Sequence, residues 1–161
     1  DQAQFFVSPN PGEELRPLAR IASGGELSRM MLALKTLAST DSPGKTLIFD
    51  EVDAGIGGRV ADVVGQRLQS LGREFQVLCI THLPQIAAAG GSHYRVAKLV
   101  RQGRTVTSIE HLADEARIDE VARMMAGAVV TDGARSAARE MIAARGGENE
   151  RGAKGERRKR K

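Results

Sequence analysis

The distribution of apolar residues predicts two short buried strands joined by a helix. Residues 46–49 and 77–80 lack polar alternation, which suits central strands of a parallel sheet that is covered on both faces. A helical stripe lies between them and ends before Gly72: Val60, Val63, Val64, Leu68 and Leu71. Strand, helix and strand in this order predict a right-handed βαβ unit.

A second helix is predicted to begin at about residue 24. Ser23, followed by Glu26 three residues later, forms a capping-box pattern. The apolar residues that follow share one helical face: Leu27, Met30, Met31, Leu34, Leu37 and Ala38. This stripe indicates that the helix packs against another part of the protein.

The remaining segments complete the predicted architecture. Residues 4–7 predict a short strand, and residues 94–100 and 105–109 predict a hairpin at the edge of the sheet. Apolar stripes within residues 118–125 and 134–142 predict two more helices, packed in the core or against another lobe. The fold class that follows is α/β, with a mainly parallel sheet, flanking helices and an edge hairpin.

Positive charge is concentrated at one end of the chain. The 161 residues carry a formal net charge of +4, but residues 151–161 contain seven Lys or Arg and one Glu, so residues 1–150 carry a net −2. From residue 146 on, the composition offers too little apolar surface to offset ordering. We therefore expect residues 1–145 to form one domain and residues 146–161 to be a disordered basic tail. That tail either contacts DNA phosphate without sequence specificity or is simply solvated.

The composition also excludes several classes of protein. With no Trp and one Tyr, stacking platforms for single-stranded nucleic acid are not expected. The lone Cys79 lies in an apolar run, so we expect an inert thiol in a reducing, cytoplasmic protein. No apolar run approaches the roughly 20 residues that span a bilayer, so no membrane partner is expected. The first residue is Asp1 rather than Met, from which we expect a fragment of a longer protein.

Two adjacent carboxylates, Asp50 and Glu51, follow the first predicted strand directly. The carboxyl ends of parallel strands form the edge where open α/β sheets bind ligands. Two neighbouring acids repel each other, which favours a cation at this position. The simplest arrangement is a hydrated Mg²⁺ held by Asp50, with Glu51 acting on a water molecule, as a nucleotide hydrolase requires. The alternative is a strand that ends in a solvated acidic turn.

Two further features point to phosphate chemistry. His82 follows the second predicted strand and should emerge at the same edge, where it can contact phosphate or handle a proton, although a hydrogen-bonded loop histidine is the alternative. Gly24 and Gly25 open the helix that follows Ser23, and its free amides and dipole form an anion site, unless the glycines only shape the turn. The tripeptide at residues 44–46 imitates the end of a phosphate-binding P-loop, but it follows a helix and opens a strand, so we interpret it as a plain turn.

Three stretches together resemble a known superfamily. Ser23-Gly24-Gly25-Glu26 opening a helix, residues 47–51, and Ile80-Thr81-His82 resemble, in order and context, the signature, Walker B and switch-histidine motifs of ABC-type ATPases. Residues 22–29 and 50–58 look like the branch of DNA repair ATPases related to the structural maintenance of chromosomes (SMC) proteins. The resemblance extends from residue 5 to about residue 142.

The resemblance implies an ATPase head built from two lobes, with this chain as the C-terminal lobe and the phosphate-binding Lys on the N-terminal lobe. A long coiled coil separates the lobes in such proteins. By resemblance, Asp50 would hold Mg²⁺ through water, Glu51 would polarise the attacking water, and His82 would contact the γ-phosphate of ATP. The motif residues Ser23, Gly24, Gly25 and Glu26 would reach ATP held by a second, identical head.

The same resemblance implies a partner and a cellular role. It implies double-stranded DNA ends as the partner, repair of double-strand breaks or recombination as the role, and a cytoplasmic location at the nucleoid. The absence of the N-terminal lobe implies that some apolar surface of this chain is exposed.

Two other functions stay open from the sequence. A transporter ATPase subunit is disfavoured because Ala22 stands where Leu usually precedes the Ser-Gly-Gly motif, Glu26 where transporters usually have Gln, and Gly57 where the loop after Walker B usually carries Asp. A non-catalytic module that binds DNA or protein is the second alternative. Unchanged ATP turnover after Glu51→Gln would identify it.

Overall fold

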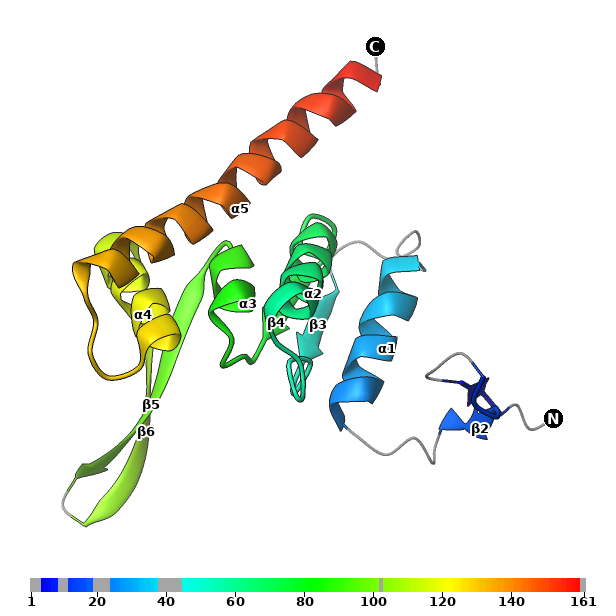
Figure 1. Ribbon diagram of the computed structural model, residues 1–161, viewed down its shortest axis with the longest axis horizontal. Helices are drawn as coiled ribbons and strands as arrows, with labels where there is room; N and C mark the ends of the chain where they lie inside the picture. Colours follow the sequence, from blue (N-terminus) through cyan, green and yellow to red (C-terminus); the bar gives the residue numbers. More distant parts are fainter. Residues whose placement is uncertain (1–3, 9–11, 19–23, 38–44, 102, 160–161) are drawn as a thin grey trace.

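The computed structural model of the chain is a mixed α/β structure (Figure 1). A small N-terminal sheet lies beside α1, a central unit of β3, α2 and β4 follows, and α3 leads to a hairpin with α4 and α5. Side chains are described as far as Arg145. The structure describes residues 4–8, 12–18, 24–37, 45–101 and 103–159.

The predicted βαβ unit is present at the centre of the molecule. It consists of β3 (Thr46–Phe49), α2 (Gly58–Leu71) and β4 (Gln76–Cys79). The strands pair in parallel, with Leu47 opposite Val77 and Phe49 opposite Cys79. Both strands therefore end at the same edge, as the sequence predicts, and Gly72 follows the last residue of α2.

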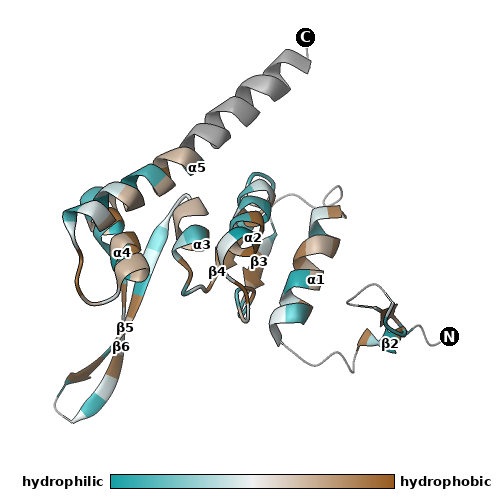
Figure 2. Cartoon of the chain, viewed as in Figure 1, coloured by the Kyte–Doolittle hydropathy of each residue, from teal (hydrophilic) through white to brown (hydrophobic). Residues whose placement is uncertain are grey.

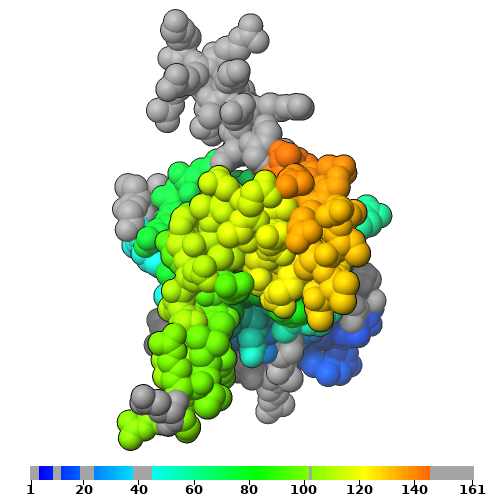
Figure 3. All heavy atoms as spheres, turned by 90° about the vertical axis from the view of Figure 1, so that its left-hand side faces the viewer, coloured from blue at the N-terminus to red at the C-terminus, as the bar shows by residue number. Residues whose placement is uncertain are grey.

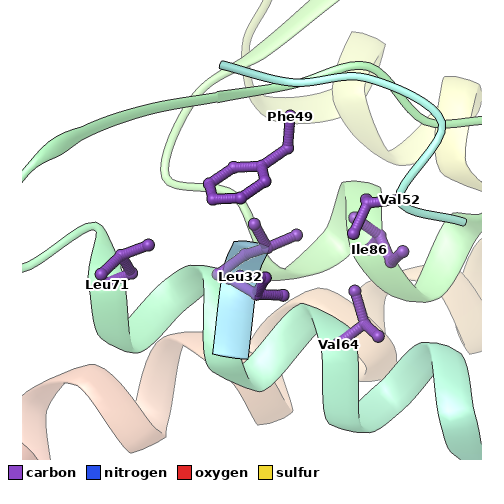
Figure 4. Close-up of a cluster of buried hydrophobic side chains, with 7 residues drawn as sticks. Leu32, Phe49, Val52, Val64, Leu71 and Ile86 are labelled. Carbon is purple, nitrogen blue, oxygen red and sulfur yellow. The ribbon is translucent and has the colours of Figure 1, made fainter. Parts of the chain in front are cut away.

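The main core lies between this sheet and three helices. Phe49 from β3 and Val52 from the turn after it meet residues of α1 (Gly24–Leu37), α2 and α3 (Pro84–Ala89) in the cluster of Figure 4. The buried members of the cluster are Leu32, Phe49, Val52, Val64, Leu68, Leu71 and Ile86. Six of these seven residues are aliphatic, and Phe49 is the aromatic member of the cluster.

The other face of the β3–β4 sheet is bare, which corrects the prediction of a sheet covered on both faces. Ile48 and Leu78 are cross-strand partners on that face and are 68% and 47% exposed. Within the described part of the chain, only the face with Phe49 is covered. The apolar run of β3 therefore indicates burial that residues 45–101 do not supply.

Helix α1 is present as predicted, but it packs through a different face from its apolar stripe. Gly25 and Leu32 are its buried residues, whereas Leu27, Met31, Leu34 and Leu37 are exposed. Ser23 and Ala38, the first and last predicted members of this segment, lie outside the described residues. The expected exposed apolar surface is confirmed, and it includes this stripe of α1.

The hairpin is confirmed, but its expected position at the edge of the parallel sheet is not. Strands β5 (His93–Arg101) and β6 (Arg104–Leu112) pair only with each other, and the described strands form three separate two-stranded sheets. The third sheet joins β1 (Phe6–Val7) to β2 (Arg16–Pro17). In Figure 3 the hairpin projects from the body of the molecule, and apolar colour marks both its strands and the β3–β4 sheet in Figure 2.

A second core joins the last two helices to α3. Ala88 packs with Val121 and Ala122 of α4 (Asp114–Ala126) and with Ala138 of α5 (Asp132–Lys159). The two predicted helices are thus confirmed. The helical backbone of α5 runs past residue 146, but the side chains from there on lie outside the described residues, so the division into a lobe and a tail stays a prediction. None of the helices in the described segments is long and apolar enough to cross a membrane.

The contact between α2 and α3 provides a test of the central packing. A Cβ atom on Gly65 would lie 3.3 Å from the Cβ of Ala89 and 3.3 Å from the carbonyl oxygen of Gln85. Gly65→Val should therefore lower the free energy of unfolding by about 1–3 kcal/mol through overpacking. Thermal unfolding followed by circular dichroism measures the change. Gly133→Val is the matched control because a Cβ there would lie 3.8 Å from Thr131 Oγ1, which is an ordinary van der Waals contact. Equal midpoints for the two variants would contradict the tight contact.

Candidate functional site

The site begins at the carboxyl end of β3, where Asp50 and Glu51 are both exposed. The Oδ1 atom of Asp50 accepts a hydrogen bond from the Glu51 N–H at 2.9 Å, and the Asp50 carbonyl accepts one from Ser28 Oγ at 2.6 Å. Glu51 has a φ of 57°, in the left-handed region that a residue with a side chain rarely adopts. Such a backbone costs about 1–3 kcal/mol and persists only where its surroundings impose it.

The N-terminus of α1 packs against this strained turn. A Cβ atom on Gly24 would overlap Oε2 of Glu51, so the glycine makes room for the carboxylate. A Cβ on Gly25 would lie 2.8 Å from the Ala54 Cβ and 2.9 Å from the Glu51 carbonyl oxygen. Gly25 is therefore required by close approach to the backbone of the turn, whereas the exposed Glu51 side chain could move away from a Cβ at position 24. The carboxylate of Glu51 also benefits from the positive end of the helix dipole.

Arg29 joins the same helix to the turn through hydrogen bonds. Its Nη1 atom donates to the carbonyl oxygen of Ala54 at 2.8 Å and to that of Val52 at 3.3 Å. Val52 is completely buried, so its carbonyl group needs a partner from the protein. Arg29 therefore fixes the carbonyl groups of the two residues that flank Asp53.

Asp53 connects this turn to His82, beyond the end of β4. Its Oδ2 atom accepts hydrogen bonds from Thr81 Oγ1 at 2.6 Å and from the His82 N–H at 2.8 Å, and it lies 3.0 Å from His82 Nδ1. Burial alone would raise the pKa of Asp53. The hydrogen bonds from Thr81 and His82, with the charge of His82, outweigh burial and lower the pKa below its ordinary value. Asp53 is therefore an ionised, buried acceptor.

The structure brings most of the predicted site residues to one edge. Asp50, Glu51 and His82 emerge at the carboxyl ends of β3 and β4, and Gly24 and Gly25 of α1 lie against the turn that follows β3. Glu26 is half-buried in the first turn of α1, and Ser23 lies outside the described residues. This shared edge is confirmed as geometry, while the chemical roles of the residues stay predictions.

Sequence reasoning missed the roles of Arg29 and Asp53. Asp53 follows Asp50 and Glu51 so closely that it reads as part of an exposed acidic turn, yet it is only 4% exposed. The available sequence signal for a separate role of Asp53 was its place as a third acid beside a loop of small residues. The sequence does not show which of three neighbouring acids turns inward.

Asp50 fits the expected Mg²⁺ ligand in a limited sense. Within the residues that the structure describes, no three His, Cys, Asp or Glu side chains are grouped to bind a metal ion. Mg²⁺ at nucleotide sites uses one or two carboxylates and takes its other ligands from water and phosphate. One exposed carboxylate at the end of β3 meets that requirement.

The interpretation of residues 44–46 as a turn rather than a P-loop agrees with the structure where it is described. Thr46 begins β3, and its hydroxyl donates to Gln76 Oε1 on the neighbouring strand at 2.6 Å. A P-loop would instead open a helix at this point. Gly44 lies outside the described residues.

No protein-family model matches the chain. Several curated proteins do match it over most of the chain. A protein of Xylella fastidiosa (strain Temecula1) is 48% identical over 142 residues, which is 88% of this chain and 26% of that protein. A protein of Deinococcus radiodurans is 50% identical over 136 residues, 84% of this chain and 24% of that protein. One of Treponema pallidum is 54% identical over 127 residues, 79% of this chain and 22% of that protein.

These relatives share one functional class. Each is a DNA repair protein, and the chain spans about a quarter of the length of the curated relatives it matches. The particular protein is the same in each case: over most of its residues, this chain is homologous to a segment of the DNA repair protein RecN.

Cys79, at the end of β4, is half-buried and offers a test of the packing around the end of this strand. Burial, with the charges of Asp53 and Asp50, raises the pKa of its thiol to about 12. A raised pKa keeps the thiol protonated at pH 8, so alkylation by iodoacetamide should be about 1000-fold slower than for an unperturbed cysteine. The rate should still rise about tenfold per pH unit above pH 8.

The matched control for this prediction carries one exposed thiol instead. In the double variant Cys79→Ser and Ser70→Cys, the thiol lies on the exposed end of α2 and should react at the rate of a free cysteine. Mass spectrometry of timed samples gives both rates. Comparable rates for the two thiols would contradict the burial of Cys79.

Proposed function

We propose that this chain is the C-terminal lobe of an SMC-like ATPase head that acts in the repair of DNA double-strand breaks. In this proposal ATP is hydrolysed at a composite site, formed with an N-terminal lobe of the same protein and with a second head. The observation that carries it is that three elements meet at one place. The glycines that open α1 lie against the acidic end of β3, and His82 contacts Asp53 of the turn that follows that strand.

The chemistry assigned to the edge follows from exposure and position. Asp50 would hold a hydrated Mg²⁺ through water, and this ion supplies neutralisation of phosphate charge when bound. Glu51 would orient and polarise the attacking water, since its carboxylate is exposed. His82 would contact the γ-phosphate, because its side chain is 74% exposed beyond the end of β4.

The need for an N-terminal lobe is supported by the exposed apolar surfaces. The bare sheet face carries Ile48 and Leu78, followed by the exposed Ile80, and α1 presents its stripe of Leu and Met. Large apolar patches of this kind usually mark an interface. Thr46 opens a strand rather than a helix, so the phosphate-binding loop would have to come from the other lobe.

The N-terminus of α1 supports the need for a second head. Gly24, the first residue of α1, is exposed, so this helix N-terminus begins at the surface, and free backbone amides at such a position favour an anionic ligand. Such a ligand would be ATP held by a second copy of the head, so that the active form is a homodimer. Double-stranded DNA ends are the proposed partner, at the nucleoid in the cytoplasm.

Replacing Glu51 tests the catalytic part of the proposal. In the full-length protein, Glu51→Gln should lower kcat for ATP hydrolysis about 100-fold or more, because the amide cannot polarise water as a carboxylate does. ATP binding, measured with a fluorescent analogue, should be retained. Glu74→Gln removes the same charge from an exposed position away from the site and should leave kcat unchanged. Full turnover in Glu51→Gln would favour the non-catalytic interaction module.

Replacing Leu34 tests the docking of the N-terminal lobe on α1. Leu34→Glu places a charge in the centre of the exposed stripe and should weaken binding of the separately expressed N-terminal lobe by at least about tenfold. Titration calorimetry measures the affinity. Ala33→Glu is the control, because the next residue along a helix points about 100° away. Equal affinities for both variants would show that the stripe is not the interface.

A further inference from the structure

Asp53 is one of two buried acidic residues in the described part of the chain, with Glu120. Glu120 is paired with the guanidinium group of Arg123, which accounts for its burial. Asp53 has no Arg or Lys partner among its described contacts. The three polar atoms that contact its Oδ2 atom belong to Thr81 and His82. A carboxylate buried in this way stabilises the conformation of those two residues in particular.

The geometry determines which nitrogen of His82 carries the proton. The carboxylate of Asp53 is ionised and can only accept hydrogen bonds, so the Nδ1 atom 3.0 Å from it must be a donor. The neutral ring then has its lone pair on Nε2. Because the ring is 74% exposed and Nδ1 faces Asp53, Nε2 is the nitrogen that faces outward.

We propose that Asp53 is a positioning residue, which holds the imidazole of His82 in the Nδ1–H form and directs Nε2 toward the phosphate of a bound nucleotide. The inference rests on the proposed ATPase function, and it adds a residue to which nothing in the sequence motifs gives that task. Asp53 does not touch the nucleotide and acts only through His82.

The surroundings of Asp53 make this orientation rigid. Arg29 of α1 binds the carbonyl groups of Val52 and Ala54, on either side of Asp53. The hydroxyl of Thr81 donates to Asp53 and accepts from the Leu83 N–H at 3.0 Å, just before α3 begins. Helix α1 is thus joined to the backbone of the turn after β3, and the Asp53 carboxylate joins that turn to Thr81, whose hydroxyl contacts the residue before α3. The direction of the His82 ring depends on all three.

The protonated nitrogen of His82 can be measured without any catalytic activity. In full-length protein labelled with ¹⁵N-histidine, at a pH where the ring is neutral, long-range ¹⁵N–¹H spectra should show the proton on Nδ1 of His82. The signal is assigned by its loss in His82→Ala. In Asp53→Ala the ring should shift toward the Nε2–H form that unconstrained histidine prefers, while Glu74→Gln should change nothing. A proton on Nε2 in the unaltered protein, or no shift in Asp53→Ala, would overturn the inference.

A double-mutant cycle tests whether Asp53 acts through His82 in turnover. Asp53→Ala should lower kcat about 10-fold to 100-fold, the usual effect of removing a group that orients a functional histidine. In a His82→Ala background the same substitution should change kcat by less than about twofold, because the residues act as a unit. Equal losses in both backgrounds would show that Asp53 has only a structural effect and would overturn the proposal.

A milder variant covers the case in which Asp53→Ala does not fold. Asp53→Asn keeps an oxygen acceptor without the charge, so the loss in kcat should be smaller, about threefold to tenfold, and again confined to proteins with His82. Equal losses with and without His82 would overturn the proposal here too.

The two measurements also separate this inference from the proposed function. Absence of ATP turnover in the unaltered protein would reject the ATPase proposal. The position of the proton on His82 would still decide whether Asp53 orients the ring.

Discussion

The close approach of α1 to the turn after β3 is the contact on which the candidate site depends. Gly25 allows the helix backbone to reach the turn, Arg29 binds two of its carbonyl groups, and the hydroxyl of Ser28 binds a third. These contacts supply partners for peptide groups that would otherwise be unsatisfied. They also explain how Glu51 is held in a left-handed conformation, whose cost the turn could not bear if it were solvated and mobile.

The polar groups of this turn find their hydrogen-bond partners within the described segments, whereas two apolar surfaces of the chain lack a packing partner there. The site residues are held by hydrogen bonds within the described segments. The sheet face with Ile48 and the stripe of α1 have no cover there. The hydrophobic effect favours burial of both surfaces. In the proposal above, the N-terminal lobe would supply the missing cover.

The buried carboxylate of Asp53 shows how the site gains rigidity at a cost. Removing an ionised group from water is unfavourable unless hydrogen bonds replace the lost hydration. Two hydrogen bonds to one oxygen, with His82 Nδ1 3.0 Å from the same atom, supply that replacement and at the same time fix the segment at Thr81 and His82. The edge of the sheet is therefore a connected unit rather than three separate motifs.

The sequence by itself determined the local elements and the shared edge. The apolar runs of β3 and β4 and the stripe of α2 are enough for a βαβ unit, and parallel pairing then brings Asp50 and His82 to one side. Periodicity shows which residues are apolar, but not which surface will cover them. The stripe of α1 was correctly identified, yet only the tertiary structure shows that it stays exposed while Gly25 and Leu32 pack inward. The inward turn of Asp53 was likewise decided by tertiary structure, because hydrogen-bond donors 28 and 29 residues away in sequence make its burial favourable.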